Sequence, residues 1–480
     1  MDVVLINPKF RFGKNKWEVG GRSNSMQPPL DMGWISNLLE KEKISSAIID
    51  ANINRYDDNQ ILRFLKNYKP KIIITTSASY PAYRDLTMKD SCLDTYRNVV
   101  KLVKRELPDS FVVLIGPHGT AFPKKTLEST PELDAVVVGE SEFTCTELAK
   151  QIVNEKSIDG IKNIFYRTKE NKFIETEKEG FRDELDEMGI PPYEKLELEK
   201  YVDYQFEKTK YRHTAMVSSR GCSFKCIYCF LAMVGNKQRT RSNESVLEEI
   251  DLLYNKYGIR HISFIDETFT LFKKRVETIC NELIKRNYEL TWDCETRTEC
   301  LPKNLIKLMS QAGCNRILFG IESLSPKIQK TIRKEQKPLQ VEEVLKNCKE
   351  YGIYPTPAFQ LGLPGDSMDT IKENLRRMDK LGVSITLPLI SHIFPKTELH
   401  EIAKKKGWIK GDSWEELIEV SALVENDFKD RNEFNKALKY YHKKVKLMNM
   451  RKNVNYPLIL KTIKNKGLFY TIGKGINYLK

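Results

Sequence analysis

Three cysteines stand close together in the middle of the chain, at Cys222, Cys226 and Cys229. Their C-x3-C-x2-C spacing lies in the segment SSRGCSFKCIYCF, directly after a predicted strand, so three thiolates within eight residues of loop can face one point. A [4Fe–4S] cluster normally takes four thiolates, so three would leave one iron open to another ligand. Zinc would need a fourth protein ligand, and the nearest histidine, His213, lies at the far end of the strand. The spacing therefore favours an iron–sulfur cluster over structural zinc.

The elements around these cysteines predict an open barrel. Six short apolar strands alternate with helical patterns, at 214–219, 262–266, 290–294, 316–321, 355–362 and 385–391. Helices are predicted between them near 243–257, 272–286, 302–312, 339–351 and 367–381. Six βα units are too few for an eight-fold barrel, so residues 206–405 are predicted to form a partial (β/α)6 TIM barrel with its site at the carboxyl ends of the strands.

A second α/β unit precedes the barrel. Residues 1–154 alternate β-branched strands, at 3–6, 47–50, 72–77, 112–116 and 135–139, with helices near 31–42, 58–67, 84–107 and 142–153. Such strands suit a parallel sheet buried on both faces, as in a Rossmann-like (flavodoxin-like) domain. Residues 155–205 are interpreted as a linker with a small hairpin at 164–176, and residues 406–480 as a helical extension.

The composition is that of a globular protein. The chain has 480 residues, of which 40% are hydrophobic and 30% charged, which excludes collagen-like, mucin-like and wholly disordered classes. It contains no apolar stretch of about 18 residues, and its first residues, MDVVLINPKF, resemble a strand more than a signal peptide. We therefore expect a cytoplasmic protein whose ten cysteines are reduced, the scattered ones being ordinary buried thiols.

The positive charge is concentrated at the C-terminus. Twelve Lys and Arg residues follow Glu433 and no acidic residue does, so the net charge of +14 falls to +2 for the first 433 residues. Residues 434–480 fit a solvated helix packed on the barrel, a peripheral membrane-surface helix or a docking site for an acidic electron donor. No RNA-binding module accompanies them, so nucleic acid is not expected.

The cysteine segment and the partial barrel resemble the radical S-adenosylmethionine (SAM) superfamily. The resemblance implies that the open iron chelates the amino and carboxylate groups of SAM. It also implies that an electron from the cluster cleaves SAM to methionine and a 5′-deoxyadenosyl radical. Tyr228 matches the family's aromatic residue between the second and third cysteines, which is expected near the adenine.

Further segments resemble the ends of the family's later strands and imply contacts with SAM. Asp266 and Glu267, in FIDETFT, would face SAM or substrate, with a helix N-cap as the alternative. Arg297, in WDCETRTECL, would point toward the SAM carboxylate, unless it forms a structural salt bridge. Glu322 and Ser323, in FGIES, would contact the ribose and amino group, although a helix-capping role explains Ser323 equally.

The last two strand ends also resemble the family. In LGLPGDS, Gly362 and Gly365 allow a tight turn and a close approach of the backbone to a ligand. FPKTEL resembles the family's PGT-x-L ending, but Lys396 stands where the family has glycine. This departure weakens the expectation of a backbone contact there.

The N-terminal unit resembles the cobalamin-binding domain found in one branch of this superfamily. That branch contains the B12-dependent radical SAM methyltransferases and proteins like the anaerobic Mg-protoporphyrin ester cyclase. The resemblance implies that cobalamin lies over the loops after the strands, near Asn7, Ser77, Gly116, His118, Gly139 and Glu140. The D-x-H-x-x-G signature is absent, so His118 is not expected to bind cobalt.

These resemblances imply a cobalamin-dependent radical SAM enzyme, and we expect a C-methyltransferase. It would act on an unactivated carbon through the deoxyadenosyl radical and methylcobalamin. The alternative is a radical SAM oxidoreductase or cyclase on the same scaffold. The expected cofactors are a [4Fe–4S] cluster, SAM and cobalamin, and the expected partners are a small-molecule or lipid-like substrate and a flavodoxin or ferredoxin.

Overall fold

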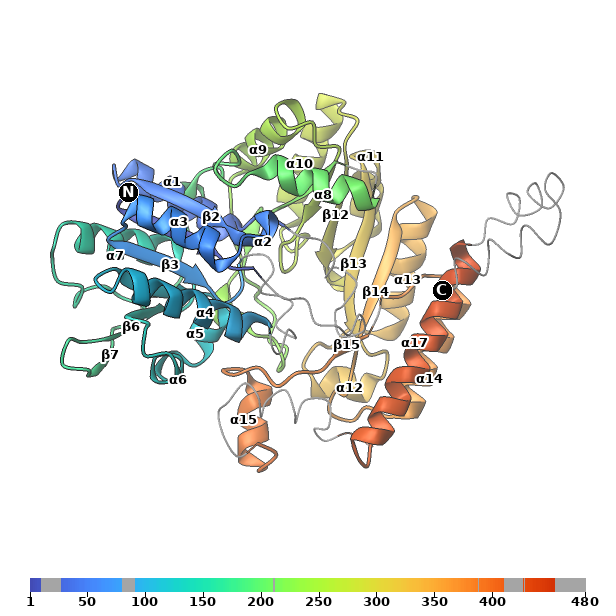
Figure 1. The fold of residues 1–480 in the computed structure, drawn as a ribbon. Helices are drawn as coiled ribbons and strands as arrows, with labels where there is room; N and C mark the ends of the chain where they lie inside the picture. The colour runs from blue at the N-terminus through green and yellow to red at the C-terminus, as the bar shows by residue number, and fades with distance from the viewer. Residues whose placement is uncertain are drawn as a thin grey trace, which may run out of the picture.

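The fold was analysed in a computed structural model, which shows two α/β units side by side and a C-terminal helix (Figure 1). The structure describes residues 1–9, 27–79, 91–209, 212–386, 388–409, 426 and 428–453. Residues 84–90 of one predicted helix and residues 454–480 of the basic segment lie outside these ranges. Within the described ranges, no helix combines the length and apolarity that crossing a membrane requires.

The N-terminal unit is a seven-stranded sheet in the order β2-β1-β3-β4-β5-β6-β7. Its strands are β1 (Val3–Asn7), β2 (Ser46–Asp50), β3 (Ile72–Thr76), β4 (Phe111–Ile115), β5 (Ala135–Val137), β6 (Ile164–Arg167) and β7 (Phe173–Glu175). Its helices are α1 (Leu30–Lys41), α2 (Ala51–Asn54), α3 (Asp58–Tyr68), α4 (Ser91–Glu106), α5 (Pro117–Ala121), α6 (Pro123–Ser129) and α7 (Glu142–Val153). Strands β1 to β5 are parallel, as predicted.

Burial on both faces explains the apolar strands of this sheet. In β1, Val4 and Ile6 pack into one hydrophobic cluster, whereas Val3 and Leu5 pack into another on the opposite face. Side chains alternate across a strand, so a strand between two helical layers needs apolar residues at every position. The Rossmann-like prediction is therefore confirmed.

The hairpin predicted at 164–176 is present, and it extends the N-terminal sheet. Strand β6 pairs antiparallel with β5, and β7 pairs antiparallel with β6. The segment interpreted as a linker thus contributes two strands to the first unit. It then continues through η2 (Leu185–Met188) and α8 (Leu198–Thr209), which lead to the barrel.

The second unit is a half-barrel of six parallel strands in the order β15-β14-β13-β12-β11-β8, as predicted. Its strands are β8 (His213–Met216), β11 (His261–Phe264), β12 (Thr291–Thr296), β13 (Cys314–Glu322), β14 (Tyr354–Leu361) and β15 (Leu389–Ile390). Its helices are α9 (Asn243–Asn255), α10 (Lys273–Arg286), α11 (Lys303–Gln311), α12 (Pro326–Thr331), α13 (Pro338–Glu350), α14 (Met368–Leu381) and α15 (Glu398–Lys405). A short ladder of β9 (Ser219–Arg220) and β10 (Arg239–Thr240) follows β8.

The last strand, β15, is shorter than predicted. Its register pairs with β14 form at residues 389 and 390, and the Thr386 and Ser391 N–H groups also donate to β14 carbonyls, at 3.2 and 2.8 Å. Helix α17 (Arg431–Asn453) lies along α14 (Figure 1). At the start of the predicted strand, the side-chain amide of Asn449 accepts a hydrogen bond from the Ile385 N–H at 3.1 Å and donates one to the Ile385 carbonyl at 2.9 Å. Ile385 is therefore bound by the helix and not by β14.

The apolar residues of α17 belong to the core of the barrel. Phe434, Ala437, Tyr441, Val445 and Met448 are buried in the main hydrophobic cluster. Residues 434–448 thus pack on the barrel, as one of the three expectations for the basic segment has it, while roles at a membrane surface or for an electron donor stay predictions.

Candidate active site between the two domains

The cysteine loop leaves the end of the first barrel strand through a tight turn at Gly221. Its backbone has a φ of +87°, and a Cβ atom there would lie 2.2 Å from the Lys237 carbonyl oxygen. Only glycine fits this close approach, which presses the loop against residues 234–237. In the loop, the Cys222 Sγ lies 3.5 Å from the Thr268 Oγ1.

The donor set of this loop fits an iron–sulfur cluster. The Cys229 N–H donates a hydrogen bond to the Cys226 carbonyl at 3.1 Å, so these two cysteines flank one turn. Burial and the neighbouring sulfurs of Cys222 and Cys226 raise the pKa of the Cys229 thiol. None of the cysteines that the structure describes forms a disulfide. Within the same residues, no three His, Cys, Asp or Glu side chains converge on one metal ion. A cluster distributes its thiolates over separate irons, so it does not require such convergence.

Arg297 forms the salt bridge that the sequence left as an alternative. Its guanidinium pairs with Glu299, and it donates a hydrogen bond to the Cys226 Sγ at 3.2 Å. It also stacks on the Phe224 ring, with 3.7 Å between its Cζ and the ring centroid. Arg297 therefore places a positive charge beside Cys226, a predicted cluster ligand, while its contact with the SAM carboxylate also remains a prediction.

Glu322 ends the fourth barrel strand in a strained conformation. Its φ is +64°, and the register with β14 shifts between Gly320 and Glu322. A left-handed conformation is costly for a residue with a Cβ, and such strain is concentrated at functional sites. The buried carboxylate accepts a hydrogen bond from the Tyr228 hydroxyl at 3.2 Å. The structure thus brings two predicted SAM contacts together.

Lys334 contacts both Glu322 and Tyr228. The sequence analysis did not identify this residue. Its ammonium lies 2.9 Å from the Glu322 Oε1 and 3.3 Å from the Tyr228 hydroxyl, and its side chain is only 6% exposed. Arg333 and Glu335, on either side, have φ values of 53° and 58°. The segment IRKEQ matches no motif and reads as a solvated charge run, so only the tertiary fold reveals its role.

Asp266 and Glu267 both face the cysteine loop. Asp266 is fully buried and accepts hydrogen bonds from the Ser218 N–H at 2.8 Å, the Ser218 hydroxyl and the Ser219 hydroxyl. The Glu267 Oε2 accepts a hydrogen bond from the Gly221 N–H at 2.9 Å. Helix α10 begins only at Lys273, so neither residue is its N-cap. Both carboxylates hold the base of the loop, and a direct contact with SAM or substrate remains a prediction.

The remaining predicted SAM contacts lie in turns. Ser323 is buried, and its hydroxyl accepts a hydrogen bond from the Ser325 N–H at 3.2 Å. Ser325, not Ser323, is the N-cap of α12. Gly362 and Gly365 have φ values of 82° and 83°, which explains glycine at both positions.

Polar residues lie at the carboxyl ends of the N-terminal strands, where the resemblance places cobalamin. The Asn7 side chain donates to the Asp50 Oδ1 at 3.0 Å, and Tyr201 donates to the other oxygen of that carboxylate. Burial raises the pKa of Asp50 to about 6. Asp50 and Tyr201 had not been singled out, because a buried pair from distant segments leaves no local pattern.

The loop after β4 offers a surface that a macrocycle could approach. Gly116 has a φ of +99°, and a Cβ atom there would lie 2.9 Å from the Ser77 Oγ. The Ser77 hydroxyl also accepts a hydrogen bond from the His118 N–H at 3.3 Å. Glycine at position 116 thus lets this loop pack against the residues that follow β3, at the strand ends where the resemblance places cobalamin.

Glu140 links the two domains. Its carboxylate pairs with both terminal nitrogens of Arg239, at 2.6 and 2.8 Å, and lies 3.4 Å from Arg220. Arg220 also pairs with Glu142 at 2.6 Å. Arg220 and Arg239 are register partners on β9 and β10, directly before and after the cysteine loop. These bidentate and buried pairs fix the cysteine loop against the N-terminal strand ends.

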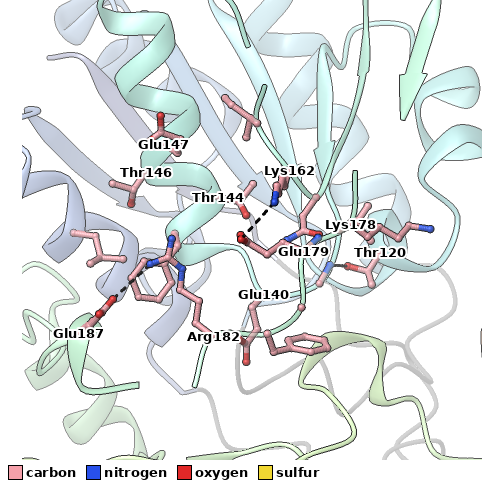
Figure 2. Close-up of a pocket in the computed structure, with 18 of the residues that line it drawn as sticks. Thr120, Glu140, Thr144, Thr146, Glu147, Lys162, Lys178, Glu179, Arg182 and Glu187 are labelled. Carbon is pink, nitrogen blue, oxygen red and sulfur yellow. Dashed lines mark hydrogen bonds and ion pairs between the residues drawn. The ribbon is translucent and has the colours of Figure 1, made fainter. Parts of the chain in front are cut away.

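Two cavities adjoin this contact. A large groove of about 930 Å³ runs along α7 and is lined by Thr120, Gly139, Phe143, Arg182 and Lys396 among others (Figure 2). A small cavity of about 20 Å³ is lined by Gly116, Gly139, Glu140, Arg220 and Val234 among others. Gly139 and Glu140 line both, so the strand ends, the barrel and the groove meet at these two residues.

We expect that the His118 side chain does not bind cobalt. Its ring is buried near Arg97 of α4, and burial together with that charge lowers the pKa of His118 to about 3. The cob(II)alamin form should show no nitrogen superhyperfine splitting from a protein ligand in its electron paramagnetic resonance spectrum. A His118→Gln variant with bound cobalamin should give the same spectrum. A splitting that disappears in the variant would show that His118 binds cobalt.

Comparison with known proteins agrees with this geometry. The Radical SAM superfamily model matches residues 216–378, and the B12 binding domain model matches residues 19–149. An uncharacterized methyltransferase of Pyrococcus horikoshii is 29% identical over 402 residues, which cover 83% of each chain. Anaerobic magnesium-protoporphyrin IX monomethyl ester cyclase of Rubrivivax gelatinosus is 25% identical over 385 residues, covering 78% of this chain and 65% of the cyclase.

A solved structure shares the whole two-domain arrangement. The radical SAM methyltransferase TsrM from Kitasatospora setae, with cobalamin and a [4Fe–4S] cluster bound, has a TM-score of 0.69 and 18% sequence identity. The match covers 85% of this chain and 76% of TsrM, and it shows the fold. The two matched domains imply a [4Fe–4S] cluster, SAM and cobalamin, in agreement with the prediction. The chain is therefore a radical SAM enzyme and belongs to the branch of that superfamily that carries an N-terminal B12-binding domain.

Proposed function

We propose that this protein transfers a methyl group to a carbon atom of a small-molecule substrate. The observation that carries this proposal is the fixed contact between the cysteine loop and the cobalamin-side strand ends, made by Arg220 and Arg239 with Glu140 and Glu142. When bound, one SAM at the cluster would supply a radical that removes hydrogen, and cobalamin would supply a methyl group taken from a second SAM, which leaves as S-adenosylhomocysteine. A substrate bound at this contact would be accessible to the radical from the barrel side and to the methyl group from the cobalamin side.

The chain's own residues bind and orient these groups. Cys222, Cys226 and Cys229 would hold the cluster, and Arg297 donates to one of its ligands. Tyr228, Glu322 and Lys334 form a polar group beside the cysteine loop, where SAM is expected. Glu322 and Lys334 are buried, whereas Tyr228 is half-buried.

The names of several relatives support methyl transfer. Cytidylyl-2-hydroxyethylphosphonate methyltransferase of Streptomyces wedmorensis is 23% identical over 477 residues, covering 84% of this chain and 86% of that enzyme. Together with the methyltransferase of P. horikoshii, it makes methyl transfer the better-supported activity, although the cyclases share the same scaffold.

The activity can be tested with reconstituted protein. Anaerobic incubation with SAM, cobalamin, a reductant and candidate extracts should release 5′-deoxyadenosine and S-adenosylhomocysteine, and mass spectrometry should show a product heavier by one CH2. Deoxyadenosine without homocysteine would contradict methyl transfer. A product that has lost hydrogen or gained oxygen would instead establish the oxidoreductase or cyclase alternative.

We also propose that an acidic electron-donor protein docks on the exposed face of α17. Lys436, Lys439, Lys443 and Lys446 are exposed and recur at three- and four-residue intervals, so they form one stripe. Glu433 is the only acidic residue on this helix. A single-sign stripe attracts a surface of opposite charge and raises the rate of encounter. Flavodoxins and ferredoxins are donors of this kind.

Charge reversal of this stripe tests the docking without disturbing the core of the barrel. Changing the four lysines to glutamate should slow flavodoxin-dependent SAM cleavage about tenfold at low salt, and the defect should shrink as salt screens the charges. Cleavage driven by dithionite should not change. If flavodoxin-dependent rates are unaffected but binding to anionic liposomes is lost, the stripe binds a membrane surface instead.

A further inference from the structure

Arg297 joins the third barrel strand to the cysteine loop. It directly follows β12 and is only 6% exposed. Its Nη1 donates a hydrogen bond to the Cys226 Sγ at 3.2 Å. The Phe224 ring stacks on the guanidinium, with 3.7 Å between the Arg297 Cζ and the ring centroid. Phe224 and Cys226 belong to the same loop, so this loop packs around the positive charge that contacts its second cysteine.

Glu299 fixes the orientation of the Arg297 guanidinium. The Glu299 Oε1 pairs with both Nε and Nη2 of Arg297, and its Oε2 accepts a hydrogen bond from the Gln336 amide at 2.9 Å. Nη2 also donates a hydrogen bond to the Lys334 carbonyl. These contacts hold the planar guanidinium in one orientation and occupy Nε and Nη2, which leaves Nη1 directed at the Cys226 sulfur.

The positive charge of Arg297 is more buried than the carboxylate that pairs with it. The Arg297 side chain is 7% exposed, and the Glu299 side chain is 27% exposed. Water therefore screens the carboxylate more strongly, and the Cys226 sulfur lies next to the positive end of the pair. Lys225, which directly precedes Cys226 in the loop, is exposed to solvent. The field at this sulfur is therefore set more by Arg297 than by the lysine beside it in the chain.

A contact of this kind acts on the reduction of a cluster. A [4Fe–4S] cluster is reduced by one electron, so its reduced form carries one more negative charge than its oxidised form. A positive charge or a hydrogen bond at a ligand sulfur stabilises the reduced form more than the oxidised form, and this difference raises the reduction potential. The effect is largest at a buried contact, because little water is present to screen the charge.

We propose that Arg297 raises the reduction potential of the cluster through its hydrogen bond to Cys226, and so makes the cluster easier for a flavodoxin or ferredoxin to reduce. One electron passes from the donor protein to the cluster, and the arginine neither gains nor loses a proton. Arg297 acts through the cysteine, so it is a positioning residue in this role. The inference rests on a cluster at Cys222, Cys226 and Cys229 and is independent of methyl transfer.

The test is potentiometry of the reconstituted full-length protein without SAM or cobalamin, with the electron paramagnetic resonance signal of the reduced cluster as the readout. Arg297→Met removes both the charge and the hydrogen-bond donor. At a fixed solution potential, the ratio of reduced to oxidised cluster should fall about tenfold, which is a shift of about 59 mV to a more negative potential. Glu299→Gln keeps the donor and removes the opposing charge, so it should shift the potential in the positive direction.

Two further variants complete the test. Arg297→Gln decides the question if Arg297→Met holds no cluster, because its amide can still bond to Glu299 while the charge beside the sulfur is lost. It should shift the potential in the same negative direction. Lys225→Met is the matched control, since it removes an exposed charge from the same loop. Solvent screens that charge, so the potential of this variant should equal that of the wild type.

The outcomes separate this inference from the assignments on which it rests. An unchanged potential in the Arg297 variants, or an equal fall in Lys225→Met, would overturn the inference. Weaker SAM binding by the Arg297 variants at an unchanged potential would assign Arg297 to the SAM carboxylate instead. If the wild type holds no [4Fe–4S] cluster, the ligand assignment itself is refuted. If the potential shifts as expected but no methylated product forms, the inference stands and only methyl transfer is refuted.

Discussion

Replacing any one of Cys222, Cys226 and Cys229 by alanine will abolish the iron–sulfur cluster and, with it, the cleavage of SAM. Three thiolates already leave one iron without a protein ligand, so removing another leaves only two anchors. Each variant, reconstituted anaerobically with iron and sulfide, should lack the broad absorbance near ~400 nm that is typical of thiolate-ligated clusters. No 5′-deoxyadenosine should form.

Cys300→Ala is the matched control for these variants. Cys300 is buried and is close enough to Cys222 for the two sulfurs to interact electrostatically, yet it lies outside the cysteine loop. Its replacement should leave cluster absorbance and iron content unchanged. Full SAM cleavage by Cys226→Ala would refute the ligand assignment, and cluster loss in Cys300→Ala would show that the assay reports general damage to the barrel.

Lys334→Met is expected to damage both the fold and SAM binding. Lys334 and Glu322 form an ion pair with exposed side-chain fractions of 6% and 9%. Breaking such a pair leaves one buried charge without a partner, which costs roughly 3–5 kcal/mol of unfolding free energy. Glu322 and Tyr228 would also lose the ammonium that orients them, so the Kd for SAM should rise roughly 10–100-fold.

A double variant separates these two effects. Lys334→Met combined with Glu322→Gln removes both charges, so it should recover much of the stability lost in the single variant but not the affinity for SAM. Lys330→Met, an exposed lysine on α12, should change neither quantity. Recovery of SAM affinity in the double variant would show that Lys334 acts only on folding. Normal SAM affinity in Lys334→Met would show that Lys334 is not part of the SAM site.

The helices and strands could be predicted from the sequence, because the residue patterns that indicate them are confined to neighbouring residues. Runs such as VVLI at β1 and RILFGI at β13 are buried strands whose period and β-branching are visible in the sequence. The loop from Cys222 to Cys229 was equally visible, since its three cysteines lie within eight residues. The start of the last predicted strand was not equally visible, because the partner of Ile385 is the Asn449 side chain, 64 residues away.

The parts of the site that could not be predicted depend on contacts between distant segments. Lys334 meets Tyr228 across 106 residues, and Arg239 meets Glu140 across 99. In the sequence, Lys334, Arg239 and Glu140 each resemble an ordinary surface charge. Packing within the barrel buries Lys334, and packing between the two domains buries the Arg239–Glu140 pair. Arg297 is the opposite case. The family resemblance assigns it to the SAM carboxylate, but in the structure its guanidinium already has partners in Glu299 and Cys226.

The packing of α17 has a consequence for the synthesis of the chain. Its buried side chains complete the hydrophobic cluster of the barrel, yet α17 follows β15 by about 40 residues in the chain order. Without this helix, the apolar surface that it covers on the barrel would be exposed to water, and exposed surface of this kind makes incomplete chains prone to aggregate. The ribosome must therefore add α17 before the core of the barrel is complete, so termination between β15 and α17 would release an aggregation-prone product.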